Sequence, residues 1–234
     1  MTSTIDPNTK LGQLVRKNPA FAPVFESLGI DYCCGGDVPL GHACDENDLE
    51  VRSVVEQLEE ARSTGQTGTD DESLSALVDD IVETHHDYLR SELPSLERVV
   101  RKVARVHGDT HPELWEIETA FLDLKADVTH HIADEEENVF PEITTLDEEA
   151  WRSEADTAAL HEAIDHLESE HAAAANQLER IRSLSDDYAI PEDACTSYRN
   201  MLDRLKILEE DMHLHVHKEN NVLFLEAEER LAGK

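Results

Sequence analysis

Four long segments in the second part of the chain place apolar residues at every third or fourth position, and each carries a histidine within its apolar stripe. Steps of three and four residues turn one face of a helix toward a core, so the sequence predicts four amphipathic helices. Two of the histidines are followed four residues later by a glutamate. The six residues in these stripes are His86, His131, Glu135, His171, His215 and Glu219. We therefore predict that these six side chains are potential metal ligands that face one core.

The pattern occurs twice along the chain. His131 follows His86 by 45 positions and His215 follows His171 by 44, so a helix with one histidine is followed each time by a helix with a His-x-x-x-Glu pair. The periodicity breaks near 107–112, 146–156 and 183–191, and connections of this length join antiparallel neighbours. Strand-like alternation is nowhere sustained. We therefore predict an all-α protein with an up-down four-helix bundle and a two-metal site. Pro94 predicts a kink or a local break in the first helix.

His-x-x-x-Glu spacing is weak evidence by itself, because about two matches are expected by chance in this glutamate-rich chain and four are present. Context distinguishes the pairs that end at Glu135 and Glu219, since both lie on apolar stripes and a phenylalanine follows each five residues later. A buried carboxylate without a partner costs several kcal/mol. The alternative is a polar layer of hydrogen-bonded histidines and glutamates without metal, but six such groups at one depth favour a cation. Imidazole and carboxylate ligands without thiolate suit iron, manganese or zinc.

The stripes leave two choices open. His85 and His86 both fit the first stripe, and His130 and His131 both fit the second. His213 and His217 flank His215 and point to other sides of the same helix, so we expect them to be surface groups or groups that contact the ligands.

Cys33 and Cys34 are adjacent and precede two glycines, in the string DYCCGG. A disulfide between neighbours would be strained, because their Cα atoms lie about 3.8 Å apart where about 5.5 Å is normal. Two interpretations stay open: exposed, reactive thiols that bind metal, react with nitric oxide or donate electrons, or two small buried residues in a turn. Cys44 and Cys195 are expected to be packing residues within helices.

Residues 63–72, STGQTGTDDE, are small and polar and predict a linker. We expect a cysteine-containing helical domain at 1–62 and the bundle at 73–234. The chain has 53 acidic and 20 basic residues and a formal net charge of −33, which argues against binding to nucleic acids or anionic membranes. The even spread of acidic residues favours adaptation to a salt-rich cytoplasm over an ordinary solvated surface. No apolar run suits a signal peptide or a membrane span, so we expect a cytoplasmic protein.

Several longer strings are more specific than these spacings. The first part contains LGQLV, PAFAPVFESLGIDYCCGG and LEVRSVVEQLEE, and the second contains THHDYLRSELPSL, HIADEEENVFPEI, LESEH and HVHKENNVLF. Through them, nearly the whole chain resembles the di-iron iron-sulfur cluster repair proteins, also called repair of iron centres proteins. The resemblance implies a small N-terminal helical domain with the Cys-Cys-Gly-Gly motif, followed by a hemerythrin-like four-helix bundle.

The resemblance also implies a set of ligands and a role. It selects His86 over His85 and His131 over His130, and it makes the two glutamates bridges between two non-haem iron ions, an oxo bridge being one form of the centre. Leu89 stands where relatives often have a further histidine that is not a ligand. The implied function is repair or protection of iron-sulfur clusters damaged by nitric oxide or oxidants. The resemblance further implies that Cys33 and Cys34 take part in this chemistry, that NO or O2 is the small ligand, that damaged iron-sulfur proteins are the partners, and that the protein is a homodimer.

Three other functions fit the same ligands. A hemerythrin-like carrier or sensor would bind O2 reversibly, and an iron-trafficking chaperone would pass labile iron to apo-proteins. An enzyme that reduces NO at the di-iron centre would release N2O over many turnovers. The sequence does not decide among them.

Overall fold

The computed structural model describes residues 5–62, 73–148 and 153–232. Within these ranges the secondary structure is helical, with an isolated bridge between Lys10 and Pro39 and no strand, which confirms the predicted all-α class. The chain forms two compact units. We call Val78–Met212 the bundle unit, and Met1–Leu77 together with His213–Lys234 the terminal unit. The predicted linker at 63–72 lies outside the described residues, and the predicted domain boundaries remain a prediction.

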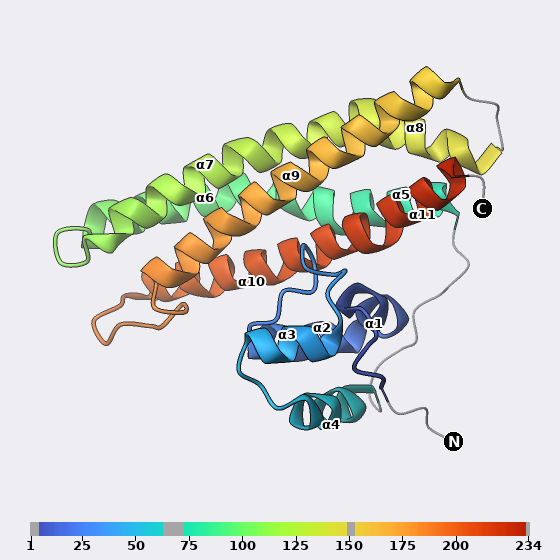
Figure 1. Ribbon diagram of the computed structural model, residues 1–234. Helices are drawn as coiled ribbons and strands as arrows, with labels where there is room; N and C mark the ends of the chain where they lie inside the picture. The colour runs from blue at the N-terminus through green and yellow to red at the C-terminus, as the bar shows by residue number, and fades with distance from the viewer. Residues whose placement is uncertain (1–4, 63–72, 149–152, 233–234) are drawn as a thin grey trace. The chain divides into compact units, whose positions relative to one another are not determined.

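Long amphipathic helices build the bundle unit (Figure 1). They are α6 (Asp87–His107), α7 (Glu113–Asp134), α9 (Glu154–Leu184) and α10 (Thr196–Lys218), with the shorter α5 (Leu74–Ile81) and α8 (Phe140–Thr144). Helix α7 packs against both α6 and α9. Arg182 of α9 pairs with Glu209 of α10 at 2.9 Å, and Arg204 of α10 pairs with Glu92 of α6 at 2.6 Å. The apolar stripes are buried between these helices, as their periodicity predicts.

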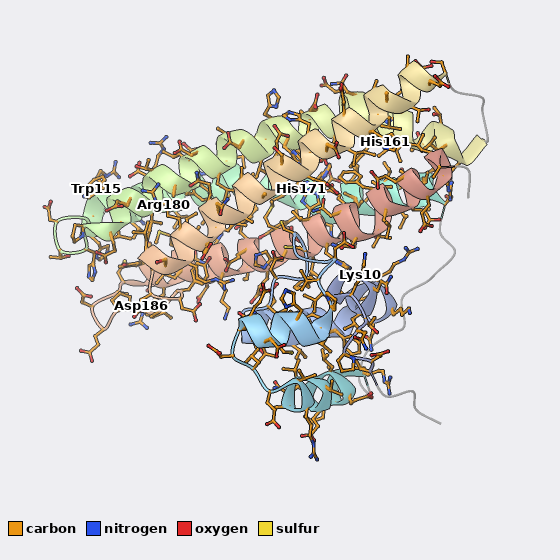
Figure 2. The ribbon with its side chains drawn as sticks, viewed as in Figure 1. Lys10, Trp115, His161, His171, Arg180 and Asp186 are labelled. Carbon is orange, nitrogen blue, oxygen red and sulfur yellow. The ribbon has the colours of Figure 1, made fainter. Side chains whose placement is uncertain are left out.

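The helix ends follow local signals in the sequence. Ser153 caps α9 by accepting a hydrogen bond from the N–H of Asp156, whose carboxylate accepts one from the N–H of Ser153 in return. Helix α9 then continues to Leu184, and His171 lies near its middle (Figure 2). Of the two effects predicted for Pro94, the local break is wrong, because α6 is helical through this residue from Asp87 to His107, and the kink remains a prediction.

Three single π-helical turns interrupt the α-helical spacing, at η2 (Val82–His86), η3 (Glu135–Val139) and η5 (Glu219–Leu223). Each begins or ends at a predicted metal ligand: η2 ends at His86, and η3 and η5 begin at the two glutamates. A π-turn contains one residue more than an α-helical turn, so it changes which side chains face the core beyond it, and such turns are frequent at functional sites. The three-and-four periodicity does not reveal them.

The terminal unit has a separate apolar core. Its helices are α1 (Leu11–Lys17), η1 (Pro19–Phe21, 3₁₀), α2 (Ala22–Leu28), α3 (Leu40–Glu46), α4 (Val51–Arg62) and α11 (Phe224–Leu231). Leu11, Phe25, Leu40 and Leu58 are fully buried in this core. Helix α2 ends at Gly29, whose φ of 66° is left-handed and therefore suits glycine. Helix α3 confirms the helical position expected for Cys44, and α1 packs against the π-turn η5.

Among the described helices, none combines the length and hydropathy that a membrane span requires.

Candidate metal centre

Three predicted ligands from α7, η3 and α9 meet in the interior of the bundle unit. Nε2 of His131 lies 3.2 Å from Oε1 of Glu135, and Nε2 of His171 lies 4.0 Å from the same oxygen. The two Nε2 atoms are 2.8 Å apart. All three side chains are buried, and Glu135 is 0% exposed. The helical spacing that put these residues on apolar stripes therefore brings their polar atoms together.

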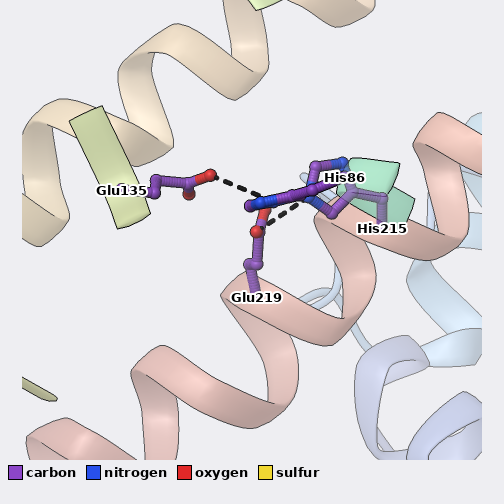
Figure 3. A group of neighbouring side chains, drawn as sticks. All are labelled: His86, Glu135, His215 and Glu219. Atoms are coloured by element: carbon purple, nitrogen blue, oxygen red, sulfur yellow. Dashed lines mark hydrogen bonds and ion pairs between the residues drawn. The ribbon is translucent and has the colours of Figure 1, made fainter. Parts of the chain in front are cut away.

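His86 approaches the same carboxylate from the end of η2. Its Nε2 lies 3.4 Å from Oε2 of Glu135 (Figure 3). The imidazole stacks on Phe140, with ring centroids 5.7 Å apart and 13° between the ring planes. Phe140 is the phenylalanine that follows Glu135 by five residues, and this contact explains its place in the motif.

Two carboxylates at the edge of the site bind the imidazole nitrogens that point away from Glu135, the Nδ1 atoms of His86 and His131. Nδ1 of His86 lies 2.7 Å from Oε1 of Glu136, and Nδ1 of His131 lies 2.7 Å from Oε2 of Glu170. An ionised carboxylate only accepts hydrogen bonds, so each Nδ1 carries the proton. Burial by itself would raise the pKa of Glu136, but hydrogen bonds from Arg90 and His86 outweigh it and hold this pKa below its ordinary value.

In the neutral imidazoles this leaves the Nε2 lone pairs of His86 and His131 facing Glu135, and Nε2 of His131 also faces that of His171 at 2.8 Å. Both carboxylate oxygens of Glu135 are buried and receive no hydrogen bond from the described residues. A negative carboxylate that faces lone pairs in a water-excluded interior is strongly unfavourable without a positive charge between them. The donor set, neutral imidazole and carboxylate with the outer nitrogens held by acids, is the arrangement that ligates transition metals. These residues therefore fit a cation.

The second His-x-x-x-Glu pair joins the last turn of α10, which carries His215, to the first residue of η5, Glu219. Nε2 of His215 lies 2.8 Å from Oε1 of Glu219, and these side chains are 1% and 0% exposed. Two sets of buried side chains have ligand atoms within 4.8 Å of one another. One set is His86, Glu135, His215 and Glu219, drawn in Figure 3, and the other is His131, Glu135, His171 and Glu219. Both glutamates belong to both sets.

The neighbouring histidines have other surroundings. His130 is exposed, and His85 is buried with its Nδ1 2.9 Å from Oδ1 of Asp211. The expectation that His217 is a surface group is wrong, because it is 4% exposed and packs edge-on against Tyr32 with ring centroids 5.6 Å apart. Burial lowers the pKa of His217 to about 4. His213 is half-buried and its Nδ1 lies 2.8 Å from Oε1 of Glu26.

The two adjacent thiols differ in exposure. Cys33 is buried and Cys34 is exposed, and neither is in a disulfide. Oδ1 of Asp31 accepts the backbone N–H groups of Cys33 and Cys34, and Oδ2 accepts that of Gly35, each at 3.0 Å. A hydrogen bond with Cys34, followed by burial, raises the pKa of Cys33 well above its ordinary value. Cys33 is thus buried, as the packing interpretation expects, and Cys34 is exposed, as the reactive-thiol interpretation expects.

Asp31, Cys33 and Cys34 also bring possible ligand atoms within 4.8 Å of one another. Because three backbone N–H groups occupy the carboxylate of Asp31, its evident role is to hold the turn. Of the other cysteines, Cys44 is buried in α3 as expected. Cys195 departs from the expectation: it is exposed, lies just before α10, and its Sγ is 3.2 Å from Nε2 of His107.

Glu136 and Glu170 contact predicted ligands, but the residue pattern did not single them out. Both are acidic residues adjacent to a predicted ligand, next to Glu135 and His171 respectively. That adjacency is the available signal, but it is weak in a chain so rich in acidic residues. A second pattern was also present in the sequence. His213, His217 and Asn221 are spaced by four residues, which places them together on a face of the helix end that differs from the face of His215 and Glu219.

Comparison with known proteins agrees with this geometry. Residues 7–62 match the ScdA_N family model, described as a domain of unknown function, and residues 77–227 match the hemerythrin HHE cation binding domain. The chain is 30% identical over 216 residues to the iron-sulfur cluster repair protein ScdA of Staphylococcus haemolyticus, covering 92% of this chain and 95% of the relative. It is 31% identical to the iron-sulfur cluster repair protein YtfE of Dickeya chrysanthemi, covering 92% and 94%. A probable iron-sulfur cluster repair protein of Haemophilus influenzae is 27% identical over the same shares. The protein thus belongs to the iron-sulfur cluster repair family, with an N-terminal ScdA_N region and a hemerythrin cation-binding domain that carries buried histidine and glutamate ligands.

Proposed function

We propose that this protein binds two iron ions and uses them to repair or protect iron-sulfur clusters damaged by nitric oxide or oxidants. The observation that carries the proposal is the buried carboxylate of Glu135, which faces imidazole lone pairs and lacks a hydrogen-bond donor among the described residues. The names of the relatives supply the class of client, iron-sulfur proteins.

The two sets of clustered side chains suggest how the ligands divide. His86 and His215 would bind one iron, and His131 and His171 the other, with Glu135 and Glu219 bridging. The membership of both glutamates in both sets supports this division. Glu136 and Glu170 would keep the imidazoles of His86 and His131 oriented through their Nδ1 protons. Bound iron would supply open coordination positions for NO or O2 and electrons for redox chemistry.

Cys34 is the better candidate for exchange with a client, because its thiol is exposed whereas that of Cys33 is buried. A thiol in reach of solvent can lose its proton to water and bind, as the thiolate, iron that a damaged cluster releases. We propose a damaged iron-sulfur protein as the partner, and we retain the cytoplasmic location and the homodimer as expectations from the sequence.

The test combines metal content with repair. Wild-type protein, Glu135→Gln, Cys34→Ser and the exposed-site controls Glu137→Gln and Cys195→Ser would be reconstituted anaerobically with ferrous iron. Iron content and Mössbauer spectra would be recorded before and after NO, and each protein added to an NO-damaged [4Fe–4S] hydratase. We expect two irons per chain and restored hydratase activity for the wild type and both controls. We expect reduced iron for Glu135→Gln and reduced repair for Cys34→Ser. A folded wild type that takes up no iron would refute the proposal.

The match to the hemerythrin domain favours one further candidate, a carrier or sensor of O2. This function predicts reversible O2 binding with an oxy-type absorption band and no restoration of the hydratase. Release of N2O over many turnovers would instead indicate an NO-reducing enzyme, and iron transfer to apo-protein without any effect of NO would indicate an iron chaperone.

A further inference from the structure

The end of α10 and the following π-turn present a second row of side chains beside the ligand row. His213, His217 and Asn221 are spaced by four residues, as are His215 and Glu219. All three contact the segment 26–36 within the terminal unit: His213 through Glu26, His217 through Tyr32, and Asn221 through Cys33. The same short stretch of chain thus carries two predicted metal ligands and the contacts to the cysteine motif.

Of these three residues, Asn221 contacts a cysteine directly. Its Nδ2 donates a hydrogen bond of 2.8 Å to the backbone carbonyl of Cys33. A Cβ atom added to Gly36 would lie 1.9 Å from Oδ1 of Asn221, and one added to Gly12 would lie 2.3 Å from it. The backbone N–H of Gly12 donates to the carbonyl of Gly36 at 2.8 Å. Two glycines therefore leave the space that this carboxamide fills, and a side chain at either position would displace it.

The cysteine loop, which we define as residues 31–37, is consequently fixed from two sides. Asp31 organises it internally through the N–H groups of residues 33, 34 and 35. From outside, Gly12 and Lys10 hold its far end at Gly36 and Asp37, and Asn221 holds the part around Cys33, with Nδ2 2.8 Å from the carbonyl of Cys33 and 3.5 Å from that of Tyr32. Loss of the Asn221 contact would loosen the loop around Cys33 and make its thiol more accessible.

Asn221 lies two residues after Glu219, inside the five-residue π-turn that begins at this ligand. Few backbone torsions separate the two residues, so a displacement of Glu219 would also shift Asn221. Oε1 of Glu219 contacts Nε2 of His215 at 2.8 Å, but this neutral contact would not balance a buried negative charge, whereas a bound cation would balance it and hold the side chain in place.

We propose that Asn221 is a positioning residue that couples the metal centre to the cysteine loop, so that Cys33 stays protected while Glu219 is held by metal and becomes reactive when the metal is lost. This inference rests on the proposed function only in taking Glu219 as a ligand. It gives the adjacent thiols separate roles: Cys34 is always accessible, and Cys33 is made available according to the state of the centre.

The experiment measures how fast iodoacetamide alkylates Cys33. Mass spectrometry with fragmentation of the loop peptide separates Cys33 from Cys34, and the exposed Cys195 serves as an internal reference for each protein. The wild type is compared with Asn221→Ala and with Asn221→Asp, which keeps the volume of the side chain but removes the donor. The matched control is Asn138→Ala in the π-turn η3, where the carboxamide donates to Asp134. Each protein is measured after chelator treatment and after anaerobic loading with ferrous iron.

We expect Cys33 of the wild type and of Asn138→Ala to react about fivefold faster without iron than with it, the factor that corresponds to one hydrogen bond of about 1 kcal/mol. In both Asn221 variants Cys33 should react at the fast rate in both states, although their iron content matches the wild type. A wild type that binds iron but shows no iron dependence at Cys33 would overturn the proposal, and so would an Asn221→Asp variant that keeps the wild-type ratio. If no iron is taken up, the proposed function fails. The coupling then fails with it, because no metal would hold Glu219, whereas a wild type that binds iron without any iron dependence at Cys33 refutes the coupling alone.

Discussion

Replacing Glu135 by glutamine should have opposite effects on stability with and without metal. In the metal-free protein the carboxylate is 0% exposed, and neither oxygen receives a hydrogen bond from the described residues. A glutamine amide removes the charge and can donate to the lone pair on Nε2 of His86 or His131, which lie 3.4 and 3.2 Å from the present oxygens. Relief of the buried charge together with one new hydrogen bond should raise the free energy of unfolding by about 2 kcal/mol.

With iron, the variant should lose its advantage in unfolding free energy, because glutamine is a poor bridging ligand. Loss of a group that merely orients a ligand costs 10- to 100-fold in metal affinity, so loss of a bridging ligand should cost at least about 100-fold. The increase in unfolding free energy that iron provides should therefore fall by at least about 2.7 kcal/mol. The variant is then more stable than the wild type without iron and less stable with it.

Urea unfolding, followed by tryptophan fluorescence, measures both quantities. Trp115 lies in α7 of the bundle unit, the helix that leads directly to Glu135, so its fluorescence reports on the part that contains this residue. Each protein is unfolded with chelator and with excess ferrous iron at one fixed salt concentration. The control is Glu137→Gln, an exposed glutamate in the same π-turn, for which we expect a change within about 0.5 kcal/mol. The reasoning is refuted if Glu135→Gln destabilises the metal-free protein by more than about 1 kcal/mol while the iron-dependent increment stays the same.

Three further predictions concern groups around the site and on the surface. Glu170→Gln should lower iron affinity about 10- to 100-fold in a ferrous titration, since a neutral amide orients the Nδ1 proton of His131 less strongly; unchanged affinity would contradict this role. Hydrogen bonds with Asp193, and then with Glu113, raise the pKa of His111 above its ordinary value against the effect of burial. Its protonation therefore stabilises the fold below about pH 6.5, and this contribution is lost as the pH rises through the folded pKa. Thermal melts should show His111→Gln to be destabilising at pH 6 and nearly neutral at alkaline pH, and equal effects at both would be inconsistent with this assignment. Because a net charge of −33 repels itself, raising KCl from about 0.1 to 1 M, which shortens the Debye length from about 10 to 3 Å, should raise the free energy of unfolding; a decrease would argue against the interpretation of the charge as adaptation to salt.

The helices of the bundle were predictable because their signal is local. Apolar residues at steps of three and four identify a helix face, and the breaks at 107–112 and 183–191 fall where α6 and α9 end. The histidines and glutamates could be recognised because a polar group on such a face must be buried with the rest of it. For the same reason Glu135 and Glu219, both 0% exposed, could be distinguished from the other glutamates.

The surroundings of these groups could not be predicted in the same way. The π-turns arise from small changes of backbone geometry that leave the residue pattern almost unaltered. Glu136 and Glu170 contact His86 and His131 because helices distant in sequence bring them together. From the sequence alone, many other acidic residues were equally good candidates. The burial of His217 and the different exposure of Cys33 and Cys34 likewise depend on what packs against them.

The sequence by itself therefore determined the helical class and the apolar faces turned inward, together with the glutamates on them, because helix periodicity and the cost of burying charge are properties of single segments. The tertiary structure decided which nitrogen faces which oxygen, which thiol is shielded, and that one carboxamide joins the cysteine loop to the turn of Glu219. These are contacts between segments up to 188 residues apart, and only the packing of the whole core selects among the alternatives that each segment leaves open.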